Sequence, residues 1–372
     1  MTRLKNISKI SQWFKGLHEP LLIAGPCSAE TEEQVMQTAL AISRLDKVKV
    51  FRAGIWKPRT RPGNFEGVGE QGLQWLKQVK KETGLLTTVE VANPEHVELA
   101  EKYNIDILWI GARTTSNPFS IQELADALKG YPGPVMIKNP INPDIQLWIG
   151  ALERFHKAGV KKLAAIHRGF YPFEATTLRN IPKWEIPIEL KSMCHTLPII
   201  CDPSHISGNT EYIPEIAQKA MDLNMNGLMI ETHINPNAAR SDMNQQLTPG
   251  QLGVILNKLI FRTTSVKNND FLSVLENLRD KIDSIDQQML ELLSQRMHVV
   301  EEIGKYKSKN EVTILQLRRW EKIVNTRIRL GKKMGLSEDF IKKLLQLVHK
   351  ESIQKQTEVM SKITASKKNR RN

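Results

Sequence analysis

Three cations within eight residues, Arg52, Lys57 and Arg59, directly follow a short apolar run at residues 48–51. A glycine and a proline between them interrupt regular structure. Cations this close repel one another unless an anion lies between them, and the fork of arginine matches a phosphate or a carboxylate. The segment therefore predicts an anion-binding loop. The alternative is a solvated basic loop.

Eight short apolar runs recur over the first 262 residues, with segments of helical periodicity between them. The runs are Leu21–Ala24, Val48–Arg52, Leu85–Val91, Ile105–Ile110, Pro134–Lys138, Lys162–Ile166, Pro198–Asp202 and Gly227–Glu231. Eightfold alternation of strand and helix over about 250 residues is typical of a (β/α)8 barrel. The alternative is an open doubly wound sheet, but no Gly-rich dinucleotide fingerprint follows the first run. We therefore predict an α/β fold, a (β/α)8 TIM barrel, over residues 1–262.

Nearly every predicted strand ends at a side chain that could bind an anion or a metal. In such a barrel the C-terminal strand ends meet at one rim, where active sites lie. The cations at this rim are Arg52, Lys57, Arg59, Arg113, Lys138 and Arg168. Six converging cations predict substrates with several negative charges, such as two phosphates.

A second set of strand-end residues offers sulfur, nitrogen and oxygen donors. These residues are Cys27, His205, Glu231 and Asp242. A mixed donor set suits a borderline divalent metal, and we expect Mn²⁺ first, with Fe²⁺, Co²⁺ and Zn²⁺ as alternatives. A lone cysteine can instead be a small buried hydrophobe, and His205 can cap a turn. His167 and His233 stay open as alternative ligands, because spacing alone does not exclude them.

The strand pattern ends at a polar linker, residues 263–269. Apolar residues then recur at three- and four-residue steps, which predicts helices over about 270–306, 317–330 and 337–363. The first helix would be ~55 Å long at 1.5 Å per residue. A helix this long cannot bury its apolar stripe alone, so we expect at least a dimer through this module. Residues 364–372 read as a disordered basic tail.

Arg296 and Lys307 are eleven residues apart on the long helix, so they lie within ~20° of one face. Arg279 lies ~25 Å away along the axis and ~100° round. One chain cannot bring all three to one small ligand. In an antiparallel dimer the partner subunit would supply Arg279; the alternative is a solvated coiled-coil face.

The chain of 372 residues carries a net charge of +13. About nine of these charges lie in residues 265–372. Anionic substrates and nucleic acid both fit this surplus, and we do not favour nucleic acid. No apolar run reaches the ~18 residues of a membrane span, and no signal peptide precedes the first strand. Three scattered cysteines predict no disulfide framework, so we expect a reducing, cytoplasmic setting.

Seven ordered motifs over about residues 15–262 resemble the type I 3-deoxy-D-arabino-heptulosonate-7-phosphate (DAHP) synthase family. They are Gly25-Pro26-Cys27-Ser28, Lys57-Pro58-Arg59-Thr60, Gly111-Ala112-Arg113-Thr114-Thr115, Ile137-Lys138-Asn139, His167-Arg168-Gly169, Asp202-Pro203-Ser204-His205 and Ile230-Glu231. The resemblance implies condensation of phosphoenolpyruvate with erythrose 4-phosphate, with release of phosphate, as the first step of the shikimate pathway. The sister 3-deoxy-octulosonate 8-phosphate synthases are the alternative; the tetrapeptide at residues 57–60 favours the four-carbon sugar.

The resemblance also assigns roles to these residues. The implied metal ligands are Cys27, His205, Glu231 and Asp242. The implied phosphoenolpyruvate contacts are Arg52, Lys57, Arg113, Lys138 and Arg168. Arg59 and Thr60 would hold the sugar phosphate, and Lys57 is a candidate proton donor. The first strand begins near residue 21, so we expect no N-terminal regulatory domain and assign feedback control to the C-terminal module.

Residues 270–360 resemble chorismate mutase of the all-helical type. The motifs are Leu278-Arg279-Asp280-Lys281-Ile282-Asp283, Leu292-Leu293-Ser294-Gln295-Arg296 and Gly304-Lys305-Tyr306-Lys307. The resemblance implies rearrangement of chorismate to prephenate at a site formed by Arg279 of the partner subunit with Arg296, Lys307, Arg319, Ser352 and Gln356. Lys307 and Gln356 would stabilise the ether oxygen. Trp320 stands where bacterial members often have Glu, and Gln316 where Asp is common. The alternative is therefore a weakly catalytic sensor that binds chorismate or prephenate.

Overall fold

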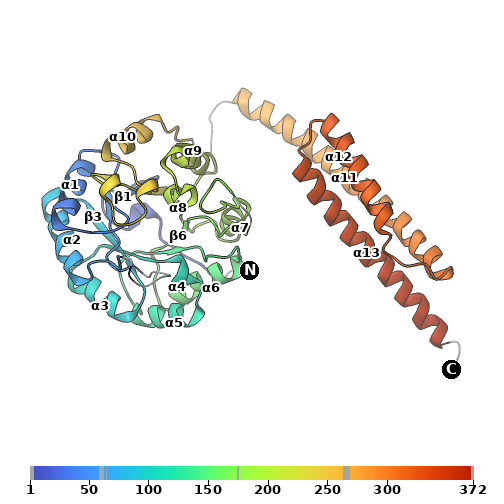
Figure 1. Cartoon of the computed structure of the whole chain (residues 1–372), viewed down its shortest axis with the longest axis horizontal. Coiled ribbons are helices and arrows are strands. Elements are labelled where there is room, and N and C mark those ends of the chain that lie inside the picture. Colours follow the sequence, from blue (N-terminus) through green and yellow to red (C-terminus); the bar gives the residue numbers. More distant parts are fainter. Residues whose placement is uncertain (1–3, 58–62, 64, 174–175, 263–268, 370–372) are drawn as a thin grey trace. The chain divides into compact units, whose positions relative to one another are not determined.

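The computed structural model describes residues 4–57, 63, 65–173, 176–262 and 269–369, except the side chains of 269–271 and 366–369. The chain forms two compact units, Met1–Thr264 and Ser265–Asn372, which are shown in Figure 1. Among the described residues, no helix combines the length and the apolar character needed to cross a membrane.

In the first unit, eight parallel strands pair in chain order and close into a barrel (Figure 1). They are β1 (Leu21–Gly25), β2 (Val50–Arg52), β3 (Leu86–Val91), β4 (Ile107–Ile110), β5 (Val135–Lys138), β6 (Leu163–His167), β7 (Ile199–Cys201) and β8 (Gly227–Glu231). The predicted (β/α)8 barrel is confirmed. The pairing of β1 with β8, in register from Leu21 and Gly227, closes it.

Helices follow the strands around the outside of the barrel. They are α1 (Glu32–Ser43), α2 (Glu70–Thr83), α3 (Pro94–Lys102), α4 (Ala112–Thr115), α5 (Pro118–Ala127), α6 (Ile145–Lys157), α7 (Glu185–Met193), α8 (Pro203–Ser207), α9 (Ile213–Asp222) and α10 (Pro249–Lys258). Local sequence fixes several of their starts. Thr31, Asn93 and Asp144 each accept a hydrogen bond from a backbone N–H in the first turn of α1, α3 and α6.

The barrel interior is filled by apolar side chains. Ile23, Ile107 and Ile166 are at most 1% exposed and pack with residues of the segment before β1, including Ile10 and Trp13. Leu21, Val50 and Ile107, the first residues of their strands, belong to the same cluster. The segment before β1 therefore packs near the N-terminal ends of the strands. At the opposite rim, the C-terminal strand ends carry polar residues such as Arg52, Lys138 and Glu231.

The second unit contains α11 (Asn269–Lys309), α12 (Leu317–Lys333) and α13 (Glu338–Asn369), and α13 packs against both other helices (Figure 1). The predicted all-helical module is confirmed. The predicted helix end at residue 363 is wrong, because α13 continues to Asn369. Residues 364–369 contain neither glycine nor proline, so nothing in them stops the helix. Residues 370–372 of the predicted tail lie outside the described part.

Candidate functional site

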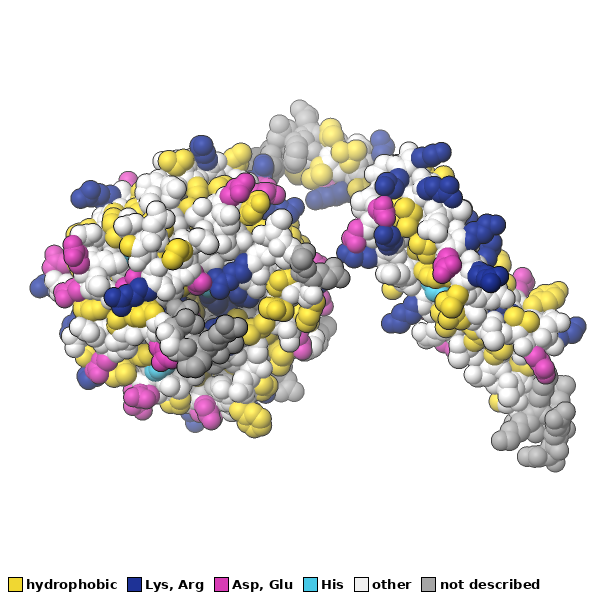
Figure 2. Space-filling model, viewed as in Figure 1, with side chains coloured by type: hydrophobic (Ala, Val, Ile, Leu, Met, Phe, Trp, Pro, Cys, Tyr) yellow, Lys and Arg dark blue, Asp and Glu magenta, His cyan; other side chains and the backbone are white. Residues whose placement is uncertain are grey.

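A cavity of about 460 Å³ lies at the C-terminal ends of the barrel strands. Its lining includes most of the predicted cations, namely Lys57, Arg113, Lys138 and Arg168, together with His205 and Asp242. Figure 2 shows Lys and Arg side chains in a hollow near the centre of the visible face of the barrel unit. A larger hollow of about 940 Å³ lies against α9 and α10, but it contains none of the predicted site residues.

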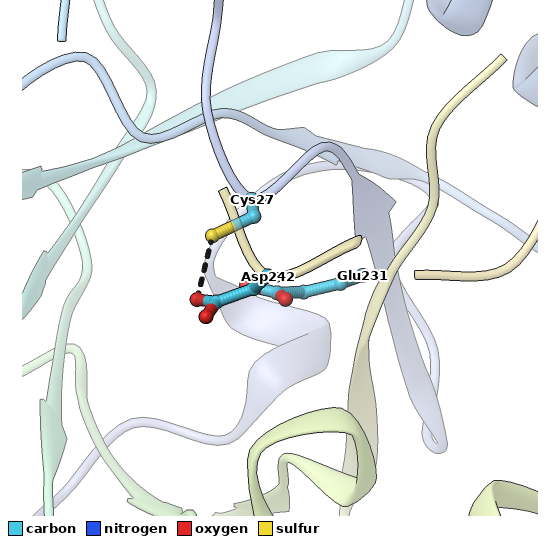
Figure 3. Close-up of side chains that lie close together, drawn as sticks. All are labelled: Cys27, Glu231 and Asp242. Carbon is cyan, nitrogen blue, oxygen red and sulfur yellow. Dashed lines mark hydrogen bonds between the residues drawn. The ribbon is translucent and has the colours of Figure 1, made fainter. Parts of the chain in front are cut away.

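Three of the four predicted metal ligands meet at this rim. One ligand atom each from Cys27, Glu231 and Asp242 lie within 4.8 Å of one another, and their side chains point together in Figure 3. Cys27 Sγ donates a hydrogen bond to Asp242 Oδ2 at 3.1 Å. Cys27 follows β1, Glu231 ends β8, and the closure of β1 on β8 brings them together.

His205 lies beside this cluster rather than within it. Its Nε2 is 3.8 Å from Glu231 Oε1, and its Nδ1 is 2.8 Å from Asp202 Oδ2. Burial lowers the pKa of His205, so the ring is neutral at neutral pH, as a metal ligand must be. The alternatives are less well placed: His167 sits among aromatic rings, and His233 Nε2 is 4.0 Å from Glu30 Oε2.

The protonation states of the cluster fit a metal site. Burial favours the neutral acid, but Arg179 and the hydrogen bond from Cys27 act against it, and the pKa of Asp242 lies below its usual range. The pKa of Glu231 is also lowered, because Arg52 and Lys57 act against burial. Two ionised carboxylates, a neutral imidazole and a cysteine sulfur are a donor set that suits a borderline divalent ion, and the thiol would release its proton when the ion binds. The ligand atoms of Cys27, Glu231 and Asp242, within 4.8 Å of one another, are spaced much like ligands around one ion with bonds of about 2.0–2.3 Å.

Cys27 is fully buried and carries its proton in the structure described here. Burial, then Glu231 and Asp242, raise the pKa of its thiol to about 12. Lys57 Nζ donates to Cys27 Sγ at 3.0 Å. Lys57 is therefore within reach of both the cluster and the cavity that it lines.

Arg52, at the end of β2, is not among the described residues that line the cavity. It is 1% exposed, its Nη2 donates to Glu231 Oε1 at 3.1 Å, and its guanidinium lies 5.0 Å from the centre of the Trp109 ring. Nε and Nη1 are buried and have no hydrogen-bond partner among the described residues. Unsatisfied buried donors favour an anion.

Lys138 and Arg168 line the cavity with their charges partly balanced by neighbours. Lys138 Nζ is 2.9 Å from Asp202 Oδ2, in a fully buried ion pair. Arg168 Nη1 donates to Asn180 Oδ1 at 2.7 Å. Burial lowers the pKa of Arg168 to about 10, with Arg179 and Arg113 acting in the same direction and Asp202 against it. Arg59 and Thr60 lie outside the described residues.

Sequence reasoning missed Glu90, Arg179, Asn180 and Gln245. Glu90 lines the cavity from the end of β3 and accepts a hydrogen bond from Trp109 Nε1 at 3.0 Å. The strand-end rule that selected the cations would have found it. Arg179 and Gln245 lie in segments after β6 and β8 that carry no sequence signal for such a role.

A second group of predicted residues meets between α11 and α13. Arg296 Nη1 donates to Ser352 Oγ at 2.6 Å, and Ser352 Oγ donates to Val348 O. Gln356, 8% exposed, donates to Ser352 O at 3.2 Å, and its Oε1 is buried without a partner among the described residues. Lys307 Nζ donates to Ile314 O at 2.5 Å.

Arg279 and Arg319 are not brought to Arg296 by hydrogen bonds or ion pairs of the described residues. Arg279 Nη1 donates to Glu276 Oε1 on its own helix, and Arg319 lies exposed on α12. Trp320 stacks on His349 of α13 with ring centroids 3.9 Å apart. Burial, with Arg296 and Lys307, lowers the pKa of His349, so this pair borders the cationic site.

Comparison with known proteins matches residues 5–268 to the DAHP synthetase I family and residues 278–357 to chorismate mutase type II. A Thermotoga maritima protein, phospho-2-dehydro-3-deoxyheptonate aldolase, is 34% identical over 226 residues, 61% of this chain and 64% of its own length. Its crystal structure, also called DAHP synthase, superposes with a TM-score of 0.57 at 30% identity, covering 64% of this chain and 67% of that one.

A more distant relative is 2-dehydro-3-deoxyphosphooctonate aldolase of Burkholderia cenocepacia, 25% identical over 291 residues, 71% of this chain and 98% of its own length. The match to the Thermotoga protein covers 64% of that protein's length, which is less than two thirds. The first family match, in contrast, extends over most of this chain. The chain therefore belongs to the DAHP synthetase I family, with a chorismate mutase type II domain following its barrel.

Proposed function

We propose that the barrel is a metal-dependent DAHP synthase that condenses phosphoenolpyruvate with erythrose 4-phosphate. The observation that carries this proposal is the cavity in which Lys57, Arg113, Lys138 and Arg168 line one space with the Cys27, Glu231 and Asp242 cluster at its edge. Four cations around one small cavity suit two phosphorylated substrates, because they offset the repulsion between the two anions.

The choice of aldehyde rests on the relatives. The 34% identical relative is named for the seven-carbon product, and the 25% identical relative for the eight-carbon product. The higher identity to the seven-carbon relative favours erythrose 4-phosphate as the aldehyde substrate. The similarity to the eight-carbon relative makes a five-carbon sugar phosphate the competing candidate.

Each group has a role in this proposal. Cys27, His205, Glu231 and Asp242 would hold the divalent metal, and when bound it supplies Lewis-acid polarisation of the aldehyde oxygen. Arg113, Lys138 and Arg168 would fix the phosphoenolpyruvate anion, together with Arg52. Lys57, between the cluster and the cavity, would deliver a proton to the developing alkoxide. Arg59 and Thr60 would hold the sugar phosphate.

Consumption of phosphoenolpyruvate tests this proposal. The assay uses erythrose 4-phosphate before chelation, after chelation and after Mn²⁺ is restored. We expect loss of turnover on chelation and recovery with metal. Turnover that persists through exhaustive chelation would contradict metal dependence. Turnover only with the five-carbon sugar phosphate would show that the chain catalyses the octulosonate reaction instead.

We further propose that the helical unit converts chorismate to prephenate. Arg296 and Lys307 would hold the substrate carboxylates, with Lys307 and Gln356 at the ether oxygen, where negative charge develops in the transition state. The unpartnered Oε1 of buried Gln356 shows that this side chain keeps hydrogen-bonding capacity. Ser352 positions Arg296 through the 2.6 Å hydrogen bond. Arg319 would contact the substrate from α12.

Turnover of chorismate, with Arg296→Ala as the background, tests the mutase proposal. We expect turnover well above the variant. Rates equal to those of Arg296→Ala, together with retained binding of prephenate, would favour the alternative of a sensor domain. The cytoplasmic location stays a prediction.

A further inference from the structure

Asp242 is a ligand candidate that regular secondary structure does not fix. It lies in the loop after β8 with φ at 50°, in the left-handed region, which aspartate tolerates better than most residues. Other side chains must therefore hold its carboxylate in place. Cys27 Sγ donates a hydrogen bond to Asp242 Oδ2. The hydrogen-bond partner of Asp242 Oδ1 comes from a different part of the barrel.

That partner is Arg179, from the segment between β6 and α7. Its Nη1 donates to Asp242 Oδ1 at 3.0 Å and to Gln245 Oε1 at 2.6 Å. Gln245, 1% exposed, donates in turn from Nε2 to Glu231 Oε2 at 2.7 Å. Two residues thus link both carboxylates of the cluster by three hydrogen bonds.

Arg179 is itself held in place. Its backbone N–H donates to Ser207 O at 3.1 Å. Its side chain passes over Gly208, where an added Cβ would lie 2.5 Å from Arg179 Cβ, and Gly208 has φ at +70°. Only glycine suits that conformation and that contact together. The backbone around Arg179 is therefore shaped to let the guanidinium reach the cluster.

We infer that Arg179 and Gln245 are positioning residues that orient Asp242 and Glu231 for the divalent metal. Side chains that hydrogen-bond to metal ligands typically change metal affinity by about 10–100-fold when removed. The positive charge of Arg179 acts in the opposite sense, because it repels a bound cation. Orientation of the two carboxylates outweighs this repulsion, an inference that rests on the metal site proposed above.

Variants of the full chain separate these effects. Arg179→Met removes the guanidinium and keeps the apolar stem. Gln245→Leu removes the link to Glu231 without any change of charge. Arg240→Met is the matched control: Arg240 is an exposed cation near Asp242 whose guanidinium lies over Phe65 at 5.3 Å. Circular dichroism of each metal-free variant first verifies that the barrel is folded.

The measurement is the dissociation constant for Mn²⁺ alone, from the free-ion signal in electron paramagnetic resonance. We expect it to rise at least about tenfold in Arg179→Met and in Gln245→Leu, and to stay at the wild-type value in Arg240→Met. Arg179→Lys keeps the charge but loses the fork, so it should recover only part of the affinity. At saturating Mn²⁺ the variants should regain most of the wild-type kcat, with KM for phosphoenolpyruvate unchanged.

Unchanged or tighter Mn²⁺ binding in both variants would overturn the inference while leaving the proposed function intact. A raised KM at saturating metal, with unchanged Mn²⁺ affinity, would also overturn it and make Arg179 a substrate contact. If the wild-type chain bound none of Mn²⁺, Fe²⁺, Co²⁺ and Zn²⁺, the metal-dependent function would be rejected, and the inference with it.

Discussion

At the scale of single residues, burial decides which polar groups are free to act. His167 ends β6 beside the site but is fully buried, and its ring centroid lies 5.2 Å from that of Trp184 and 5.9 Å from that of Phe170. His205, 38 residues later in the chain, reaches Glu231 instead. Two histidines that look equivalent in sequence are thus separated into a core residue and a ligand candidate.

We predict that His167 makes the folded barrel less stable at acidic pH. Burial, reinforced by Arg168 and opposed by Asp202, lowers its pKa from the usual 6.5 to about 3. Between these values the unfolded chain binds a proton that the folded chain does not, so stability is complete above pH 6.5 and falls as the pH falls toward 3. From pH 6.5 to 5 we expect a loss of about 2 kcal/mol from this group alone.

Urea unfolding, followed by tryptophan fluorescence at pH 6.5 and pH 5, measures this loss. His167→Gln should show a smaller decrease than the wild type by about 2 kcal/mol, although it is less stable at both pH values. Equal pH dependence in the two proteins would refute this assignment.

At the scale of elements, two close approaches build the two sites. Closure of β1 on β8 places Cys27 beside Glu231. In the helical unit, α11 meets α13 at Gly304, where an added Cβ would lie 3.3 Å from Gln356 Cα. Gly304 thus lets the two helices approach at the residue expected to act on the ether oxygen.

Gly304 therefore offers a test at this scale. Gly304→Val should push α13 away and lower kcat/KM for chorismate by tenfold or more, because small displacements of a catalytic group are costly. Gly304→Ala should have a smaller effect, since the neighbour need give only a few tenths of an ångström. Condensation of phosphoenolpyruvate by the same variants is the internal control. An unaltered mutase rate in Gly304→Val would show that this contact does not set the site.

At the scale of the whole molecule, α11 exposes an apolar stripe. Leu278, Ile282 and Ile285 are 51–61% exposed, and Met289 and Leu292 continue the series at 48% and 64%. An amphipathic helix with such a stripe needs a covering surface. A second copy of the chain would both cover it and bring the distant Arg279 to Arg296, so we propose a dimer through this unit.

Mixing of two inactive variants tests the shared site. Arg279→Ala and Arg296→Ala should each lack mutase turnover. After equimolar mixing and subunit exchange, about half of the dimers carry one intact site, so about a quarter of the wild-type rate should return. No recovery, in a mixture shown by sedimentation to be dimeric, would exclude a contribution from the partner subunit.

Regulation also belongs to this scale. We expect prephenate to suppress the synthase reaction, because prephenate is the product proposed for the helical unit and a later compound of the same pathway. Coupling of two sites requires that prephenate stabilise a less active state of the barrel. Initial rates at saturating prephenate measure the effect, and Arg296→Ala should relieve it. Synthase rates that do not respond to prephenate would exclude this feedback.

The order of strands and helices could be predicted from the amino-acid sequence, because apolar periodicity and capping residues act over a few neighbours. The meeting of Cys27, Glu231 and the cations at strand ends could be predicted as well, since strand ends of a parallel barrel share one rim. The all-helical second module followed from the same periodicity.

Which side chains meet could not be predicted in this way and follows from the folded chain. Arg52 is buried against Glu231, His205 rather than His167 lies beside that carboxylate, and Arg179 is linked through Gln245 to the cluster. These contacts join residues far apart in the chain, and their geometry depends on barrel closure and on loop conformation. Local sequence patterns report neither, because side-chain direction is set by packing against distant segments.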